Sequence, residues 1–121
     1  MGLKAAVIED DPDIAELLRQ VLGSEGFQVT LVRDGTQALP VLERSSFDVA
    51  ILDVMLPGKD GITLMREIRE NPLTKQLPVV MLSAKVDDQT MWSGWRAGCD
   101  LYLSKPFDSD KLVQAMRKVM H

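Results

Sequence analysis

The feature that most constrains the fold is a fivefold alternation of short apolar runs with longer segments whose apolar residues recur at helical spacing. Short apolar runs bounded by turn residues indicate buried strands, and apolar residues at i, i+3, i+4 and i+7 indicate helices that bury one face. Strands that alternate with helices form a parallel sheet covered on both faces and joined by right-handed crossovers. The predicted strands are 4–8, 27–32, 48–53, 78–82 and 101–104, and the helices after them begin near residues 11, 34, 61, 87 and 109.

Length and composition indicate one globular domain that spans residues 1–121. Its apolar content of 45% and charged content of 26% are ordinary for globular proteins. The net charge is −4 and no stretch concentrates Lys or Arg, which argues against direct nucleic-acid binding. No apolar stretch reaches membrane-spanning length and the first residues lack a signal-peptide pattern, so we expect no membrane association. The single cysteine, Cys99, fits a reducing compartment and hence the cytoplasm.

Three of the predicted helices carry distinctive residues. Asp11 and Pro12 open the first helix as N-cap and first helical residue. Pro40 falls inside the second, where it removes one helical hydrogen bond and is expected to kink or shorten the helix. Trp92 and Trp95 share one face of the fourth; packing against the sheet is the favoured interpretation, and exposure as an interface anchor is the alternative. The predicted buried face of the first helix consists of Ile14, Leu17, Leu18, Val21 and Leu22.

Polar side chains stand where four of the predicted strands end. Glu9 and Asp10 follow the first strand and Asp53 ends the third, while Ser83 follows the fourth and Lys105 the fifth. The doubly wound strand order 2-1-3-4-5 places these four strands side by side, with their carboxyl ends at the edge where ligands bind. A single strand-end aspartate would more often be a turn residue or a helix cap, so the inference depends on the whole group.

The chemistry of this group points to a magnesium ion and a phosphoryl group. Two carboxylates about 4 Å apart repel by about 4 kcal/mol at an effective dielectric constant of about 20, so Glu9, Asp10 and Asp53 need a cation. Oxygen donors with open coordination positions suit Mg²⁺, whereas zinc is disfavoured because His121 and Cys99 are far from these acids in the sequence. With a lysine ammonium and a serine hydroxyl beside it, the aspartate that ends the third strand would attack phosphorus and become an aspartyl phosphate.

Taken together, these residues resemble the receiver domain of bacterial two-component response regulators. The resemblance covers essentially the whole chain, and its motifs are weak singly but strong in this order. It implies an α/β, flavodoxin-like (βα)5 fold. It also implies a switch, not an enzyme, that takes phosphate from a sensor histidine kinase or phosphotransfer protein and controls an effector domain or protein. The motifs are Ile8-Glu9-Asp10, Leu52-Asp53, Pro57, Asp60-Gly61, Ser83-Ala84, Tyr102 and Lys105-Pro106-Phe107.

The resemblance also implies a role for each residue of the site. Asp53 would be the phosphoacceptor. Asp10 would be the direct Mg²⁺ ligand, Glu9 would act through a metal-bound water, and the backbone carbonyl of Met55 would complete the metal site. Lys105 would pair with the phosphoryl group, and its peptide bond to the following proline would be cis.

Further positions would govern switching and phosphate lifetime. Ser83 and Tyr102 would form the switch pair, and Met55 and Lys85 would control the approach of water to the phosphoryl group. The output surface would comprise the fourth helix, the fifth strand and the fifth helix.

One part of the pattern departs from receivers of transcription factors with winged-helix output domains, which loop 56–61 otherwise resembles. Asp100-Leu101 stands where two acids usually precede the tyrosine, and Ala115 stands where the last helix usually carries a basic residue. A phosphorylation-dependent homodimer through this surface is therefore expected to be weak, apolar and little affected by salt.

Two other functions remain open. A pseudo-receiver would keep the fold as an interaction module without chemistry, although every position that phosphorylation needs is filled. A small phosphatase that works through an aspartyl phosphate would need an acid two residues after Asp53, where Met55 stands.

Overall fold

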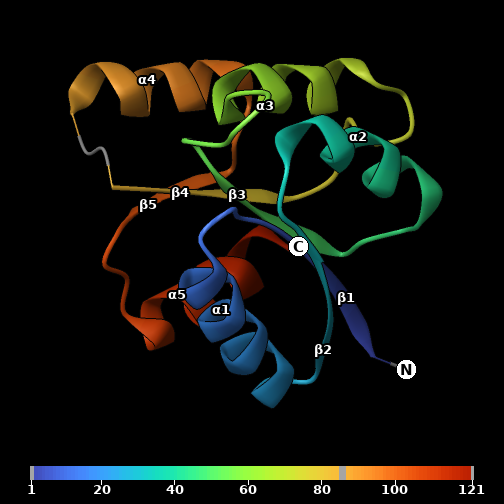
Figure 1. Ribbon diagram of the computed structural model, residues 1–121, viewed down its shortest axis with the longest axis vertical. Coiled ribbons are helices and arrows are strands. Elements are labelled where there is room, and N and C mark those ends of the chain that lie inside the picture. Colours follow the sequence, from blue (N-terminus) through green and yellow to red (C-terminus); the bar gives the residue numbers. More distant parts are fainter. Residues whose placement is uncertain (1, 85–86, 121) are drawn as a thin grey trace.

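The computed structural model describes residues 2–84 and 87–120, which form a five-stranded parallel sheet between two layers of helices (Figure 1). The strand order is β2-β1-β3-β4-β5, so the predicted flavodoxin-like (βα)5 arrangement is confirmed. The elements are β1 (Leu3–Ile8), α1 (Pro12–Ser24), β2 (Phe27–Val32), α2 (Gly35–Arg44), β3 (Val49–Asp53), α3 (Gly61–Glu70), β4 (Val79–Ser83), α4 (Asp88–Ala97), β5 (Leu101–Ser104) and α5 (Ser109–Val119).

The sheet is buried on both faces. Helices α2, α3 and α4 cover one face and α1 and α5 cover the other (Figure 1). Alternate residues of β1 divide between the two cores, Ala6 and Ile8 in the first and Ala5 and Val7 in the second. Strands buried in this way read as continuous apolar runs, which is the pattern found in the sequence. Among the described helices, none combines the length and apolar character that a membrane crossing requires.

Each of the five described helices has an aspartate as its N-cap. Asp11 accepts hydrogen bonds from the backbone N–H groups of Asp13 and Ile14 at 2.9 and 3.3 Å, as predicted for the first helix. Every helix begins where a strand has just ended, so these carboxylates collect at the carboxyl edge of the sheet while they satisfy free helix N–H groups. The other four caps are Asp34, Asp60, Asp87 and Asp108.

Helix α1 differs in detail from the sequence prediction. The fully buried side chains of α1 are Ala15, Leu18 and Leu22, and Leu17 is 45% exposed. The predicted buried face was too wide, because a helix on a sheet buries a narrow stripe and residue 17 lies one helical step outside it. Pro40 lies inside helix α2, as the sequence indicated, and the helix continues past it to Arg44; the expected kink or shortening stays a prediction.

The favoured prediction for the two tryptophans is wrong, because both point outward from α4. Trp92 is 63% exposed and Trp95 is 42% exposed. The inner side of α4 is occupied by Gly94, where an added Cβ would lie 3.1 Å from the Tyr102 ring and 3.2 Å from the Met81 sulfur. A helix that approaches β4 and β5 this closely has no space for an indole beneath it.

Candidate functional site

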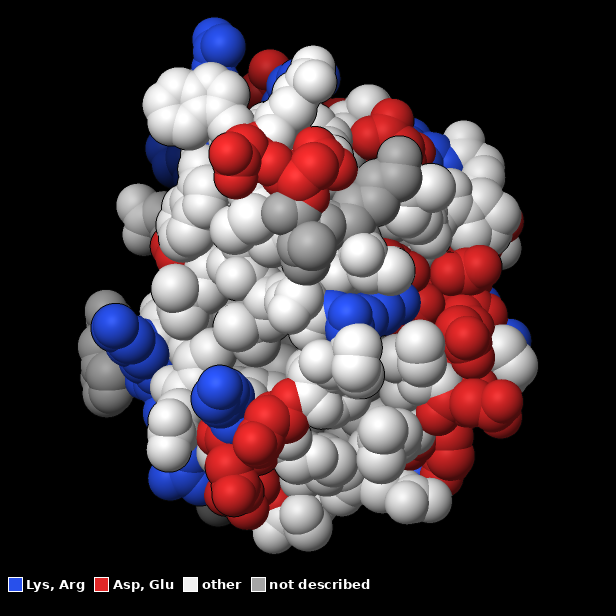
Figure 2. Space-filling view, turned by 90° about the vertical axis from the view of Figure 1, so that its left-hand side faces the viewer, with Lys and Arg blue, Asp and Glu red and all other residues white. Residues whose placement is uncertain are grey.

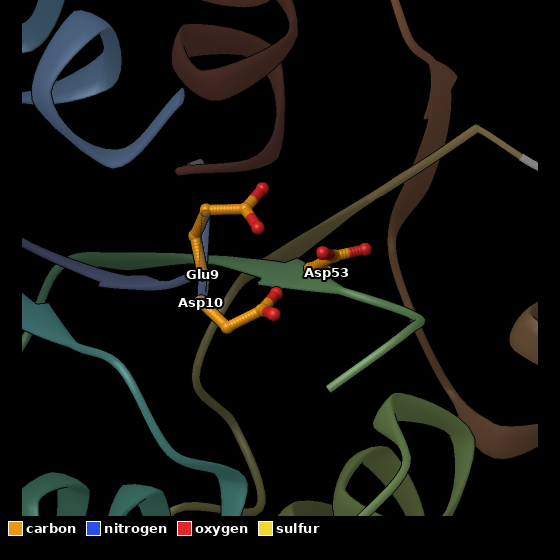
Figure 3. Close-up of side chains that lie close together, drawn as sticks. All are labelled: Glu9, Asp10 and Asp53. Carbon is orange, nitrogen blue, oxygen red and sulfur yellow. The ribbon is translucent and has the colours of Figure 1, made fainter. Parts of the chain in front are cut away.

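Three carboxylates converge at the carboxyl edge of the sheet. Glu9 and Asp10 follow β1, and Asp53 ends the neighbouring strand β3 (Figure 3). One carboxylate oxygen from each lies within 4.8 Å of the others. Glu9 and Asp53 are buried, at 1% and 4% exposure, whereas Asp10 is accessible to solvent. The strand order therefore brings together the three acids predicted from the sequence.

Lys105 places its ammonium group between two of these acids. Its Nζ lies 3.1 Å from Asp53 Oδ2 and 2.7 Å from Glu9 Oε1. The lysine side chain is itself largely buried, and its peptide bond to Pro106 is cis, as predicted. The sequence predicted that Lys105 would lie at the same edge as these acids, but it did not predict the ion pair with Glu9.

The charge balance at this site is incomplete. The pKa of Glu9 is raised to about 7, chiefly by burial and also by a hydrogen bond shared with Asp53, while Lys105 acts to lower it. Burial lowers the pKa of Lys105, but the two carboxylates outweigh it, so that the pKa is raised overall. Among residues 2–84 and 87–120, buried Glu9 Oε1 has the Lys105 ammonium 2.7 Å away but no hydrogen-bond partner. One ammonium group therefore serves two buried acids and leaves one acceptor unsatisfied.

The donor set fits a magnesium ion. All three acids offer oxygen ligands, Asp10 opens to solvent so that bound waters can be retained, and the unsatisfied Glu9 Oε1 is an acceptor that a cation or its water would use. The loop after β3 turns back over the site, since the N–H of Met55 donates to Asp53 Oδ1 at 3.1 Å.

The loop after β3 depends on a residue without a side chain. An added Cβ at Gly61 would collide with the Asp53 carbonyl, and the N–H of Gly61 donates to Val54 O at 2.8 Å. Only glycine allows the start of α3 to lie this close to the end of β3.

Ser83 and Tyr102 lie together, as the predicted switch pair requires. Ser83 is fully buried at the end of β4, and Tyr102 is 8% exposed on the neighbouring strand β5. Burial raises the pKa of Tyr102, and a hydrogen bond with Ser83 opposes that rise. The tyrosine side chain thus already lies inward in this structure. Lys85, which was expected to influence phosphate lifetime, lies outside the described residues.

Arg33 is a residue of this site that the sequence reading did not identify. It follows β2, and its Nε and Nη2 donate to the backbone carbonyl of Asp10 at 3.3 and 3.2 Å. The guanidinium group thereby holds the turn that carries Asp10. Its position directly after a strand, at the edge where the other polar residues gather, was the signal available in the sequence.

Acidic side chains also gather around the site. Figure 2 views the side on which β4 and β5 end and shows several groups of Asp and Glu, with Lys and Arg lying among them. The aspartate caps of the helices contribute to these groups, since all of them begin at this edge. An acidic rim of this kind attracts cations.

Known proteins share both the sequence pattern and the fold. Residues 5–117 match the family profile of the response regulator receiver domain. The transcriptional regulatory protein CpxR of Klebsiella pneumoniae is 39% identical over 117 residues, which are 97% of this chain and 49% of that protein. The transcriptional regulatory protein CseB of Streptomyces coelicolor is 42% identical over 113 residues, 93% of this chain and 47% of that protein. The chain thus spans about half the length of the curated relatives it matches.

Solved structures of related proteins have the same fold. A putative response regulator from Chloroflexus aurantiacus superposes with a TM-score of 0.95 at 37% identity, covering 99% of this chain and 98% of that one. The receiver domain of a sensor histidine kinase from Pseudomonas aeruginosa, with a magnesium ion coordinated in its active-site cleft, superposes with a TM-score of 0.92 at 32% identity, covering 99% and 98%. The strand-end aspartate, the two further acids and the lysine thus lie in a fold that signalling domains share. Because the family profile matches residues 5–117, the chain belongs to the response regulator receiver domain family.

Proposed function

We propose that Asp53 accepts a phosphoryl group and that its phosphorylation switches this domain between two states. The observation that carries the proposal is the buried Asp53 carboxylate at the end of β3, which Lys105 contacts at 3.1 Å and two further acids flank. A carboxylate so placed can attack phosphorus, because the lysine and a metal together offset the charge on the transferring group.

Each residue of the site has a part in this transfer. Asp10, Asp53, the Met55 carbonyl and, through a water, Glu9 would hold Mg²⁺, which when bound neutralises charge on the phosphoryl oxygens. An Asp53 oxygen bonds to phosphorus as the bond to the donor breaks. Lys105, already inside the site, pairs with the phosphoryl oxygens.

The switch would pass from Ser83 to Tyr102. Ser83 would donate a hydrogen bond to the phosphoryl group and move toward it, which changes the space open to Tyr102 on β5. Helix α4, strand β5 and helix α5 would then form the output surface, which we call the α4-β5-α5 surface. Its partners would be a downstream effector domain or protein, and the donor a sensor histidine kinase or phosphotransfer protein.

The proposal extends to phosphate lifetime and location. Met55, whose side chain is 55% exposed, and Lys85 would control the access of water to the aspartyl phosphate. The domain would take part in its own phosphorylation and dephosphorylation without turning over a separate substrate. The buried thiol of Cys99, whose pKa burial raises to about 11, is compatible with a cytoplasmic location.

Acetyl phosphate provides the test. With Mg²⁺ present, the intact mass of the wild type should increase by one phosphoryl group, and Asp53→Asn should show no increase. Asp60→Asn is the matched control, since Asp60 is an exposed cap that follows the same strand, and it should label normally. Undiminished labelling of Asp53→Asn would refute the assignment.

The same experiment separates the two other functions. A pseudo-receiver would gain no phosphate. A phosphatase would release inorganic phosphate continuously with little accumulation of labelled protein.

A further inference from the structure

Two turns carry the ligands proposed for Mg²⁺, and a third segment contacts both of them. One turn follows β1 and carries Asp10, and the other is loop 54–60, which follows Asp53 (Figure 3). The third segment is residues 33–35, which joins β2 to α2 and which we call the 33–35 segment. It offers no ligand of its own, but a segment that contacts both turns can fix the distance between them.

Arg33 holds the first turn from outside the site. Its Nε and Nη2 donate to the backbone carbonyl of Asp10 at 3.3 and 3.2 Å. Because the acceptor is the main chain, the Asp10 carboxylate stays available for an ion. The guanidinium group therefore restrains the backbone of this turn without taking the place of the ion.

Gly35, the first residue of α2, meets the tip of the second turn. Its N–H donates to Pro57 O at 3.4 Å, and an added Cβ would lie 2.6 Å from Lys59 O. From the loop side, an added Cβ at Gly58 would lie 2.8 Å from Asp34 Oδ1. The loop is thus as close to the start of α2 as two main chains allow, and a side chain at residue 35 must displace it.

A displacement at the tip of this loop would reach the metal ligands. The base of the loop is closed by the N–H of Gly61, which donates to Val54 O at 2.8 Å. The N–H of Met55 donates to Asp53 Oδ1 at 3.1 Å. Met55 therefore lies between a fixed base and the tip at 57–59, and its carbonyl and the Asp53 carboxylate would both shift if the tip moved.

We propose that the 33–35 segment sets the preference of this site for Mg²⁺ over Ca²⁺ by fixing the distance between the two turns. Mg²⁺ requires nearly octahedral oxygen ligands at about 2.0–2.1 Å, whereas Ca²⁺ accepts more ligands at about 2.3–2.6 Å in a flexible geometry. Turns that are held closely suit the smaller ion, and turns that can separate lose affinity for Mg²⁺ but keep it for Ca²⁺. The inference rests on the metal site of the proposed function, since it takes Asp10, Asp53 and the Met55 carbonyl as ligands.

Calorimetric titration with MgCl₂ and with CaCl₂, without a phosphate donor, tests the proposal. Gly35→Ala should raise the Kd for Mg²⁺ about tenfold and change the Kd for Ca²⁺ less than about twofold. Alanine forms helix more readily than glycine, so a weakened α2 cannot explain the loss. Gly23→Ala is the matched control, because an added Cβ at this glycine of α1 meets nothing within 4 Å, and both Kd values should stay unchanged.

Two results would overturn the proposal. One is a Kd for Mg²⁺ that Gly35→Ala leaves unchanged, and the other is an equal loss of affinity for both ions, which a general disturbance of the site would cause. Circular dichroism and melting establish that the variants are folded. If Gly35→Ala does not fold, Gly58→Ala opens the same contact from the loop side and should show the same selective loss of Mg²⁺ affinity.

Failure of this inference and failure of the proposed function give different results. A wild type that binds Mg²⁺ selectively but gains no phosphate from acetyl phosphate would refute the phosphoacceptor and support the role of the 33–35 segment. A wild type that gains phosphate, together with a Gly35→Ala variant of unchanged ion preference, would refute the role of this segment alone. A wild type that binds no Mg²⁺ would refute both.

Discussion

Ion pairs stand at both ends of the sheet, and they differ in how completely their charges are satisfied. At the amino ends, Arg69 of α3 donates to the carbonyl oxygens of Gly98 and Leu77 at 2.9 and 2.7 Å and to Asp100 Oδ2 at 3.0 Å. That same Asp100 oxygen accepts the N–H of Val79 at 2.8 Å. At the carboxyl ends, Lys105 pairs with both Glu9 and Asp53, and Glu9 Oε1 has no hydrogen bond to any residue that the structure describes.

This difference separates a structural ion pair from one at the proposed phosphoryl site. The Arg69 cluster joins α3 to the strand starts and to the end of α4, with guanidinium donors meeting acceptors in the chain itself. The Lys105 cluster carries excess negative charge in a buried place, which costs stability and is relieved by a bound cation or by a proton on Glu9. A charge whose partners all lie within the chain indicates a structural role. A buried charge with too few partners indicates a binding site for a cation.

Replacement of Lys105 should have the largest effect, and it should act on chemistry. In Lys105→Met the rate of labelling by acetyl phosphate should fall by about 100-fold or more, since a donor aimed at developing charge is lost. Lys111→Met, an exposed lysine in the first turn of α5, is the matched control and should label at the wild-type rate. A near-normal labelling rate in Lys105→Met would show that the Lys105 cluster is no more involved in phosphoryl transfer than the Arg69 cluster.

Replacement of Arg69 should act on stability instead. Arg69→Met should lower the free energy of unfolding by about 2 kcal/mol, because partly buried acceptors lose their donors. Its labelling rate at a temperature where it stays folded should equal that of the wild type, since the phosphoryl site lies at the other edge. Arg66→Met, on the exposed side of the same helix, should change neither quantity. Loss of labelling in folded Arg69→Met would show that the two edges are coupled.

Magnesium should relieve the unsatisfied charge. A tenfold excess over its Kd should add about 1.4 kcal/mol to the free energy of unfolding, measured by denaturant melts with and without the ion. Asp10→Ala should reduce that increment. An increment that is equal in the wild type and in Asp10→Ala would place the ion elsewhere.

The stabilisation by Mg²⁺ should also depend on pH. The pKa of Glu9 in the folded, metal-free state is about 7, against an ordinary value of 4.5. Between these values the native state holds a proton that the unfolded state has released, so this contribution to stability is complete below pH 4.5 and lost as pH rises to 7. The stabilisation by Mg²⁺ should grow over the same interval, because the ion and the proton compete. A Mg²⁺ increment independent of pH would contradict this account.

Arg33 should have the smallest effect. Arg33→Ala frees the turn that carries Asp10 and should raise the Kd for Mg²⁺ about fivefold, equivalent to about 1 kcal/mol, with little change in melting temperature. Arg33→Lys should recover part of the affinity, and Arg19→Ala, on the exposed face of α1, should have no effect. An unchanged Kd for Mg²⁺ in Arg33→Ala would show that Arg33 does not position Asp10 for the ion.

The sequence by itself determined the elements, their order and the identity of the central acids. Apolar runs and helical periodicity are local properties, and β2 and β5 have the bounds that these patterns predict. The predicted strand order then places Glu9, Asp10 and Asp53 at one edge, because parallel strands end together. The cis peptide before Pro106 and the Ser83–Tyr102 pair were available from the resemblance alone.

Only the tertiary structure decided which charges meet and which faces are open. The ion pair of Glu9 with Lys105, the bond from Arg33 to the Asp10 carbonyl and the Arg69–Asp100 bridge join residues distant in sequence, where no spacing rule applies. Periodicity places Trp92 and Trp95 on one side of α4 but is blind to which side faces the sheet. That choice followed from Gly94, whose missing side chain lets α4 approach Tyr102 closely and turns the indoles toward solvent.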